Sequence, residues 1–219
     1  MAQIKFHSMA DSAYLWTAMH VAAEKGVSYE FVPLEYRSAE HLKLHPFGKM
    51  PVLQHGERFL YETAAIAHYI DKAFDGPPLQ PADALEQALV VRWISVVNSY
   101  VFPIMNRFMK ERLVKQAWGF EADQAFIDSA AGPLALQVGL IDEATSKSDY
   151  LVGNALTLAD SFLLPQLLFF AITPEGTALL DKAAGAKAWL ARMCERQSFL
   201  NSPMRQVFDN MSKIKLDTN

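Results

Sequence analysis

The spacing of hydrophobic and polar residues divides the chain near residue 80: strand and helical patterns alternate before that point, and helical spacing prevails after it. Before that point, two short apolar runs of strand length, Ile4–His7 and Ser28–Leu34, flank a stretch with helical spacing, Ala13–Lys25. Gly26 follows the helical stretch as a stop signal. An order of strand, helix and strand predicts a parallel pair of strands joined by a crossover.

A second group of elements follows in the same region. Val52–Gln54 and Arg58–Tyr61, separated by a turn at residues 55–57, predict a β-hairpin. Apolar residues then return to helical spacing, and Thr63 is the expected N-cap of that helix. Pro51 cannot donate to a central ladder, so we expect it at the start of a strand, where a cis bond is plausible. Together these elements predict a small α/β sheet, similar to the thioredoxin-like pattern.

The strongest break in the chain is Asp75-Gly76-Pro77-Pro78, with Pro81 close behind it. It predicts two domains, residues 1–75 and 82–219. Helical spacing dominates the second domain. The expected helices cover residues 82–112, bent at Pro103, residues 122–144, broken or loosened around Gly132-Pro133, and residues 158–172, 177–182, 186–197 and 203–211.

Thr157 and Asp160 have the spacing of a capping box at the start of the most apolar of these helices. In such a box the acid bonds back to the first turn of its own helix. We therefore interpret Asp160 as a structural residue and not as a catalytic one.

Composition narrows the possible functions and compartments. The chain has 219 residues, 51% of them hydrophobic, which is enough for a substantial core. Its formal charge of −4 is spread over interspersed acids and bases, so we predict no nucleic-acid partner and no membrane partner. The apolar run Phe162–Ile172 is too short to span a bilayer. Cys194 is the single cysteine, and the first residues lack an apolar leader, so we predict a cytoplasmic protein.

The most informative segment is Gly48-Lys49-Met50-Pro51, followed after the hairpin by Glu62 and Thr63. A helix N-terminus can hold a carboxylate, and Glu62 beside it can hold an ammonium, so the pair suits an amino acid zwitterion. Met50, which precedes a strand-opening proline, can pair through its backbone with an extended peptide. Each feature alone would also fit an ordinary hairpin and a capped helix, but their order and spacing favour a binding site.

These residues resemble the glutathione-binding segment of cytosolic glutathione transferases. Residues 46–53, Pro-Phe-Gly-Lys-Met-Pro-Val-Leu, and residues 62–66, Glu-Thr-Ala-Ala-Ile, carry the resemblance, with Thr63 where serine is usual. Ala39-Glu40-His41-Leu42 is similar to the phi class, while His45 replaces the usual asparagine. The capping box at Thr157 is similar to the one in the C-terminal domain of the family.

The resemblance implies an α/β thioredoxin-like N-terminal domain and an all-α C-terminal domain. It also implies a homodimer that uses glutathione as a co-substrate, with His41 holding the glycine carboxylate. The residues expected to bind glutathione are His41, Lys49, Met50, Pro51, Glu62 and Thr63.

Glutathione transfer requires the thiolate, because an ordinary thiol with a pKa around 8.5 is mostly protonated near neutral pH. A hydroxyl that donates to sulfur at the positive end of a helix favours the anion. Ser12 lies just before the first helix, and the resemblance to the phi and theta classes implies that it is the catalytic residue. Ser8 lies too near the strand and Tyr14 lies inside the helix. A purely capping role for Ser12 or Asp11 stays open, and Asp11 would oppose ionisation unless it faces solvent.

The second substrate is expected to be a small hydrophobic electrophile. Soft apolar side chains on both sides of the domain boundary are the candidates for its site, although such stripes are often plain core. They are Met9, Ala10, Tyr14, Val101, Met105 and Phe108. The six histidines lack the spacing of a metal site, so we predict no metal.

Two alternatives remain. A non-catalytic protein of the same fold could bind hydrophobic ligands or a protein partner, because a fold does not establish chemistry. An enzyme could also use the same thiolate for isomerisation or dehalogenation.

Overall fold

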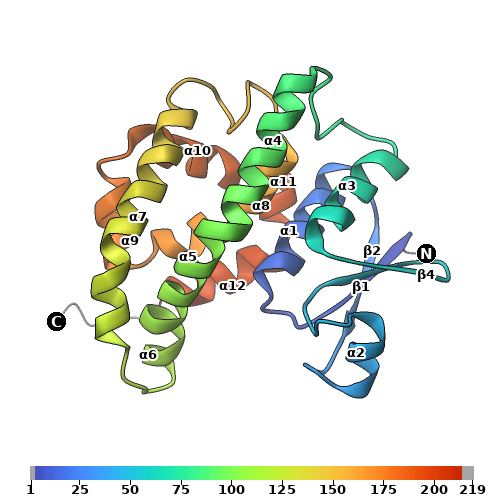
Figure 1. Cartoon of the computed structure of the whole chain (residues 1–219), viewed down its shortest axis with the longest axis horizontal. Coiled ribbons are helices and arrows are strands. Elements are labelled where there is room, and N and C mark those ends of the chain that lie inside the picture. Colours follow the sequence, from blue (N-terminus) through green and yellow to red (C-terminus); the bar gives the residue numbers. More distant parts are fainter. Residues whose placement is uncertain (1–2, 214–219) are drawn as a thin grey trace. The chain divides into compact units, whose positions relative to one another are not determined.

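A computed structural model describes residues 3–213 of the chain, apart from the side chain of Gln116 (Figure 1). Contacts between residues divide the chain into two compact units, Met1–Pro81 and Ala82–Asn219. The outer ends of the two expected domains, residues 1–2 and 214–219, lie outside the described residues.

The first unit is built on a four-stranded sheet with the strand order β2-β1-β3-β4. β1 pairs in parallel with β2, and β3 pairs antiparallel with both β1 and β4. Phe6 of β1 lies opposite Leu53 of β3, and both side chains are buried. The strands are β1 (Ile4–Ser8), β2 (Tyr29–Pro33), β3 (Val52–His55) and β4 (Arg58–Tyr61).

Three helices flank this sheet, namely α1 (Ala13–Glu24), α2 (Ala39–Leu44) and α3 (Thr63–Ala73). α1 and α3 pack against each other, and α2 lies on the other side of the sheet (Figure 1). The sequence did not predict α2. A helix of six residues that buries only His41 is too short to show a helical period.

The last residues of the first unit are held in place by hydrogen bonds to two of its buried side chains. The ammonium of Lys25 donates to the carbonyls of Gly76, at 3.3 Å, and Pro77, at 3.1 Å, and lies 3.6 Å from the Asp71 carboxylate. That carboxylate also accepts a bond of 2.8 Å from the Leu79 N–H. The first unit therefore extends beyond Asp75, because a buried lysine and aspartate satisfy the backbone of the following residues.

One continuous helical run opens the second unit. It consists of α4 (Ala84–Val96), a π-helical turn η1 (Val97–Val101), α5 (Phe102–Met109), a second π-helical turn η2 (Lys110–Val114) and α6 (Lys115–Ala117). Pro103 lies in the first turn of α5, so the irregularity falls in the preceding π-helical turn. There the Gln137 amide donates to the Tyr100 carbonyl at 2.9 Å. A neighbouring helix thus satisfies the interrupted backbone.

The remaining helices are α7 (Gln124–Thr145), α8 (Leu158–Ala171), α9 (Pro174–Leu180), α10 (Ala184–Cys194), α11 (Gln197–Leu200) and α12 (Pro203–Met211). The expected break of α7 at Gly132-Pro133 is wrong, because the helix continues through both residues. Both are exposed, so solvent can reach the carbonyl that the proline leaves without a donor. α11 is a single short turn that the sequence did not predict.

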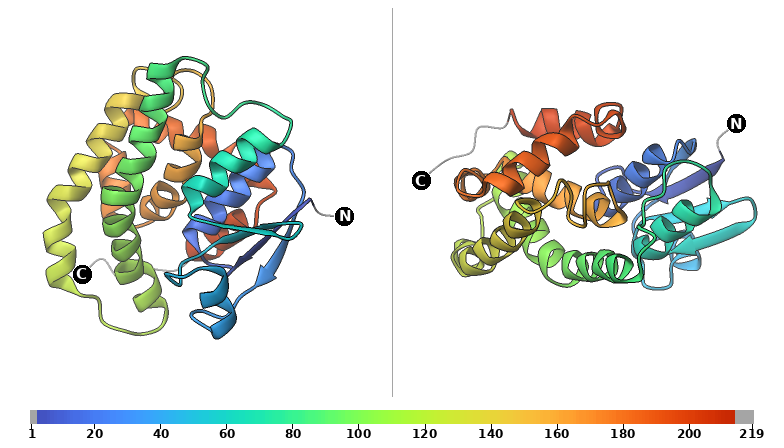
Figure 2. Two further views of the ribbon diagram at one scale, coloured as in Figure 1. Left: turned by 45° about the vertical axis from the view of Figure 1, so that its right-hand side comes forward. Right: turned by 90° about the horizontal axis from the view of Figure 1, so that it is seen from above.

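α8 is the core helix of the second unit, and the other helices surround it (Figure 2). All but its last residue are buried. The capping box at its start is present, as predicted, and Asp160 is completely buried. Its carboxylate accepts bonds from the Leu151 N–H, the Thr157 N–H and hydroxyl, and the Trp189 indole, all between 2.8 and 2.9 Å. Asp160 thus joins three separate parts of the helical unit.

The run Ala84–Val114 is long and apolar enough to cross a membrane when judged by length and composition alone. α8 and α9 meet the same criteria only as a pair, and they are bent by 114° at the break between them. Core helices of soluble proteins also meet these criteria. We therefore infer no membrane span from either feature.

Candidate functional site

The sheet topology brings three segments to one end of β1. β1 ends at Ser8, and the antiparallel β3 starts at Val52, which lies opposite His7. β4 returns to the same end, because Tyr61 lies opposite Val52. The loop after β1, the loop before β3 and the start of α3 must therefore lie close together.

Individual contacts confirm that these segments meet. The Met9 N–H donates to the sulfur of Met50 at 3.1 Å. The carboxylate of Glu62 interacts with the phenol of Tyr14 and lies 3.9 Å from the His45 imidazole. Residues 9–14, 45–51 and 62–63 consequently form one cluster, which we call the loop cluster.

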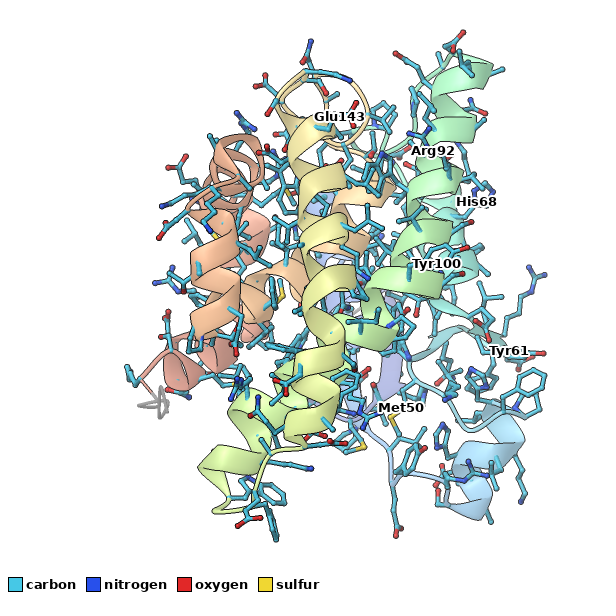
Figure 3. All side chains as sticks on the ribbon, turned by 60° about the vertical axis from the view of Figure 1, so that its left-hand side comes forward. Met50, Tyr61, His68, Arg92, Tyr100 and Glu143 are labelled. Carbon is cyan, nitrogen blue, oxygen red and sulfur yellow. The ribbon has the colours of Figure 1, made fainter. Side chains whose placement is uncertain are left out.

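Met50 and Pro51 are joined by a cis peptide bond, as predicted. Figure 3 labels Met50 on the loop before β3 and Tyr61 at the end of β4. Among the described residues, the amide and carbonyl of Met50 have no backbone partner. They are therefore available to the backbone of an extended ligand.

The start of α3 differs from the prediction. Glu62, and not Thr63, is the N-cap residue, and Thr63 is already the first residue of the helix. Glu62 has a φ of 71°, which is unusual for a residue with a side chain, and no side chain caps the helix. Its side chain is 63% exposed, while Thr63 is buried. The first N–H groups of α3 thus lie uncapped beside an exposed negative charge, so they can receive an anion.

Ser12 is the N-cap of α1, and its hydroxyl oxygen accepts a long bond of 3.4 Å from the Leu15 N–H. No acceptor for the hydroxyl hydrogen of Ser12 is found among the described residues. Capping and donation to a ligand are therefore compatible, since a hydroxyl can accept and donate at once. Asp11 is exposed, whereas the rival Ser8 is completely buried.

Tyr14 stays a neutral phenol near neutral pH. Burial, and then the negative charge of Glu62, raise the pKa of Tyr14 far above its ordinary value of 10.0. Its hydroxyl can therefore donate a hydrogen bond but cannot serve as a base.

His41 supports the loop cluster through two hydrogen bonds to backbone groups. Its Nδ1 accepts a bond of 2.9 Å from the Arg37 N–H, so Nε2 carries the hydrogen and donates to the Lys49 carbonyl at 2.8 Å. The ring is completely buried. The expected contact between His41 and a glycine carboxylate would require one of these bonds to break, because both ring nitrogens already have partners. His41 holds the backbone of Lys49 in place here, and its contact with the glycine carboxylate stays a prediction.

Arg37 is a candidate that the sequence reasoning missed. A methyl group placed on Gly48 would lie 3.9 Å from Cζ of Arg37, so the guanidinium group lies over Gly48 and beside exposed Lys49. The backbone of Arg37 is left-handed, with a φ of 59°. No sequence pattern announces this turn, which explains why the residue was missed.

The residues expected to contact the second substrate divide into two groups. Met9 and Ala10 are exposed in the loop cluster. Val101, Met105 and Phe108 are each 1% exposed, and the Phe108 ring packs against Phe170 at 5.7 Å. These three side chains are core residues of the second unit, and their place in the substrate site stays a prediction. Helical spacing alone cannot separate a buried face from a face that lines a pocket.

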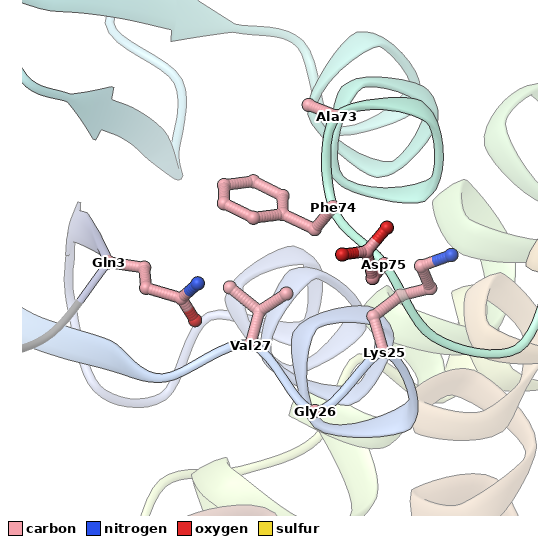
Figure 4. Close-up of a pocket in the computed structure, with 7 residues that line it drawn as sticks. All are labelled: Gln3, Lys25, Gly26, Val27, Ala73, Phe74 and Asp75. Atoms are coloured by element: carbon pink, nitrogen blue, oxygen red, sulfur yellow. The ribbon is translucent and has the colours of Figure 1, made fainter.

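A pocket of about 370 Å³ lies elsewhere in the first unit (Figure 4). Gln3, the turn after α1 and the end of α3 line it, so it lies at the opposite end of β1 from the loop cluster. Its one lysine, Lys25, is already bonded to backbone carbonyls and Asp71. We therefore do not assign it to the functional site. Within residues 3–213, no group of three or more His, Cys, Asp or Glu side chains could hold a metal ion.

Comparisons with known proteins show the family to which the chain belongs. Residues 2–72 match the family model "Glutathione S-transferase, N-terminal domain", and residues 94–197 match "Glutathione S-transferase, C-terminal domain". Glutathione S-transferase 1 of Zea mays is 30% identical over 203 residues, which cover 90% of this chain and 94% of the relative. Glutathione S-transferase 3 of the same plant is 30% identical over 208 residues, which cover 91% of this chain and 92% of the relative.

Solved structures with the same fold include two ligand complexes. Glutathione S-transferase I bound with lactoylglutathione has a TM-score of 0.82 at 29% identity, covering 91% of this chain and 98% of that chain. Glutathione S-transferase I from maize in complex with an atrazine glutathione conjugate also has a TM-score of 0.82, at 28% identity, covering 98% of this chain and 100% of that chain.

Proposed function

The chain belongs to the glutathione S-transferase family and conjugates glutathione to electrophiles, and we propose that the loop cluster carries out this reaction with Ser12 as the catalytic residue. The observation that carries the proposal is the meeting of Ser12, Met50 and Glu62 at one end of the sheet. The Ser12 hydroxyl, the Met50 backbone and the Glu62 carboxylate can each bind a ligand.

Glutathione has two charged ends and a backbone between them, and the loop cluster offers a partner for each. The exposed carboxylate of Glu62 holds the γ-glutamyl ammonium, while the uncapped start of α3 at Thr63 holds the γ-glutamyl carboxylate. The free amide and carbonyl of Met50 pair with the cysteinyl unit, and Pro51 fixes their direction. At the other end, Lys49 and Arg37 supply positive charge for the glycine carboxylate.

The Ser12 hydroxyl donates a hydrogen bond to the glutathione sulfur. The proton of the thiol leaves to solvent, and the hydroxyl together with the N-terminus of α1 stabilises the remaining thiolate. The sulfur lone pair then forms the new bond to the electrophilic carbon. In a substitution the leaving group departs with its bonding electron pair, and in an addition the pair moves onto the acceptor. The exposed side chains of Met9 and Ala10 beside Ser12 suit a small hydrophobic electrophile.

A spectrophotometric titration of bound glutathione tests the role of Ser12. Ser12→Ala should raise the pKa of the bound thiol by roughly one to two units, since one charge-assisted hydrogen bond is worth about 1.5 to 3 kcal/mol. Turnover should fall much more than glutathione affinity. Ser202→Ala is the matched control, because Ser202 caps α12 through a similar bond of 3.3 Å. The control should leave the thiol pKa unchanged.

Two results would contradict this role. Equal thiolate absorbance near neutral pH in wild type and Ser12→Ala would make Ser12 a helix cap only. A wild-type protein that binds glutathione and forms no thiolate would favour the non-catalytic alternative.

We further propose a cytoplasmic homodimer with a role in detoxification, in which residues 1–75 bind glutathione and residues 82–219 form the helical domain. Family membership supports these statements. The atrazine conjugate bound by the maize relative supports a small hydrophobic electrophile as the second substrate.

A further inference from the structure

His45 is the most unusual polar residue of the loop cluster. Its side chain is 1% exposed, and its Nδ1 is buried without a hydrogen-bond partner among the described residues. Its other nitrogen, Nε2, lies 3.9 Å from Oε1 of Glu62. That distance is too long for a hydrogen bond but short enough for an ion pair if the ring is protonated.

The His45 ring also contacts two segments of the proposed glutathione site, the loop before β3 and the end of β4. It packs against Tyr61 with the ring centroids 4.7 Å apart and the ring planes tilted by 40°, and Phe47 packs edge-on against it at 6.3 Å. The backbone carbonyl of His45 accepts from the Gly48 N–H at 2.8 Å, at the start of the loop that presents Met50. His45 therefore lies between this loop and the residue that precedes Glu62.

We propose that His45 is a positioning residue that acts through Glu62, so that the protonation state of its ring sets the affinity for the γ-glutamyl ammonium. The inference rests on the proposed function, because it takes Glu62 as the partner of that ammonium. As a neutral ring, His45 supports Tyr61 by packing and leaves the Glu62 carboxylate free. As an imidazolium, it pairs with Glu62 and repels the ligand cation.

Charged groups on every neighbouring element determine how the ring titrates. Burial lowers the pKa of His45, the Glu62 carboxylate opposes this, and His41 of α2 and Lys49 of the loop lower the pKa further. Tyr14 of α1 faces Glu62 as a neutral phenol and adds no charge. The ring is therefore neutral at neutral pH and accepts a proton only in more acidic solution.

Linkage fixes the direction of the pH effect. An ammonium bound at Glu62 disfavours a second positive charge on His45, so ligand binding lowers the pKa of this ring further. The bound state then holds fewer protons than the free protein, and affinity must fall as the pH falls through the pKa of the free protein. The ligand and the ring proton exclude each other.

Calorimetric titration with S-hexylglutathione tests this inference, because the probe has no thiol to titrate. Between about pH 7.5 and about pH 5, wild-type affinity should fall roughly tenfold, and binding in the acidic range should release a proton into the buffer. Two buffers of different ionisation enthalpy measure that release. His45→Asn, which places the usual family residue here, and His45→Phe, which keeps an aromatic ring, should both show a nearly flat pH profile.

His68→Asn is the matched control, since His68 is exposed and bonded to Gln80. This variant should keep the wild-type pH profile. A flat wild-type profile, or an equal slope in folded His45→Asn, would overturn the inference while leaving the proposed function intact. A wild-type protein that fails to bind S-hexylglutathione at any of these pH values would instead overturn the proposed function.

A measurement on the wild type alone keeps the inference testable if the variants do not fold. The imidazole resonances of His45, followed by NMR during a pH titration, should show a lower pKa with S-hexylglutathione bound than without it. An unchanged or higher pKa in the complex would overturn the inference.

Discussion

The starts of α8 and α3 carry similar residues and use them in opposite ways. At α8, Asp160 is completely buried, and four donors from three parts of the second unit reach its carboxylate. At α3, Glu62 is 63% exposed in a left-handed backbone conformation, and no side chain caps the helix beside buried Thr63. A threonine and an acid thus stabilise the fold where their partners are internal, and they can recognise a ligand where partners are lacking.

The start of α1 lies between these two cases. Ser12 uses its oxygen in one long capping bond of 3.4 Å, while its hydroxyl hydrogen has no acceptor among the described residues. At the three helix starts, the polar groups therefore find all, some or none of their hydrogen-bond partners within the described protein. Substitutions along this series should shift their effect from stability to binding.

Asp160→Ala should have the largest effect on stability. It leaves the Leu151 N–H, the Thr157 N–H and the Trp189 indole without an acceptor in the core, so the free energy of unfolding should fall by about 3 to 5 kcal/mol. Urea denaturation of Asp160→Ala and of a control variant, Asp181→Ala, measures this loss. Asp181→Ala is the control, because the Asp181 carboxylate forms an exposed ion pair with Lys187, and its loss should cost less than about 1 kcal/mol. Equal effects of both variants would remove the contrast between the two helix starts.

Substitutions of Glu62 should weaken glutathione binding more than they lower the free energy of unfolding. Glu62→Ala should weaken glutathione binding by about tenfold to a hundredfold, because it removes the only exposed carboxylate proposed to face the γ-glutamyl ammonium. Calorimetry measures this loss. Glu57→Ala, in the exposed turn of the hairpin, is the charge-matched control and should bind normally.

Glu62→Gly sharpens the same test, because glycine adopts a φ of 71° without a steric penalty. This variant should lose as much affinity as Glu62→Ala but should be more stable than Glu62→Ala by about 1 kcal/mol. Urea denaturation of both variants measures the difference. Equal stability would show that the left-handed backbone at this position carries no strain, and unchanged affinity in both would remove Glu62 from the site.

The elements that the sequence predicted well are those whose signals are local. The hairpin, the helix after it and the capping box at Thr157 follow from alternation, periodicity and short-range spacing. The cis bond before Pro51 followed from its place at the start of a strand. These signals also carried the family resemblance, and the family is shown by the matches over both domains.

The properties that the sequence could not decide arise only when distant residues pack. His41 has the residue type of a ligand-binding group, but the Arg37 N–H and the Lys49 carbonyl occupy both of its nitrogens. Val101 and its neighbours lie at helical spacing that fits a pocket as well as a core. The burial of His45 and the position of Arg37 over Gly48 depend on loop geometry, which no periodicity encodes.

The smallest expected effect is the stability change of Ser12→Ala. Its capping bond of 3.4 Å is long, so its loss should lower the free energy of unfolding by only about 0.5 to 1 kcal/mol. Ser202→Ala, at the similar cap of α12, should cost at least as much, because the Ser202 hydroxyl also donates to the Phe199 carbonyl at 2.7 Å, while only Ser12→Ala should slow glutathione conjugation. Urea denaturation and turnover measured on both variants therefore separate the two roles of Ser12. A loss of turnover that follows stability equally in both variants would place Ser12 with Asp160, among residues that serve folding alone.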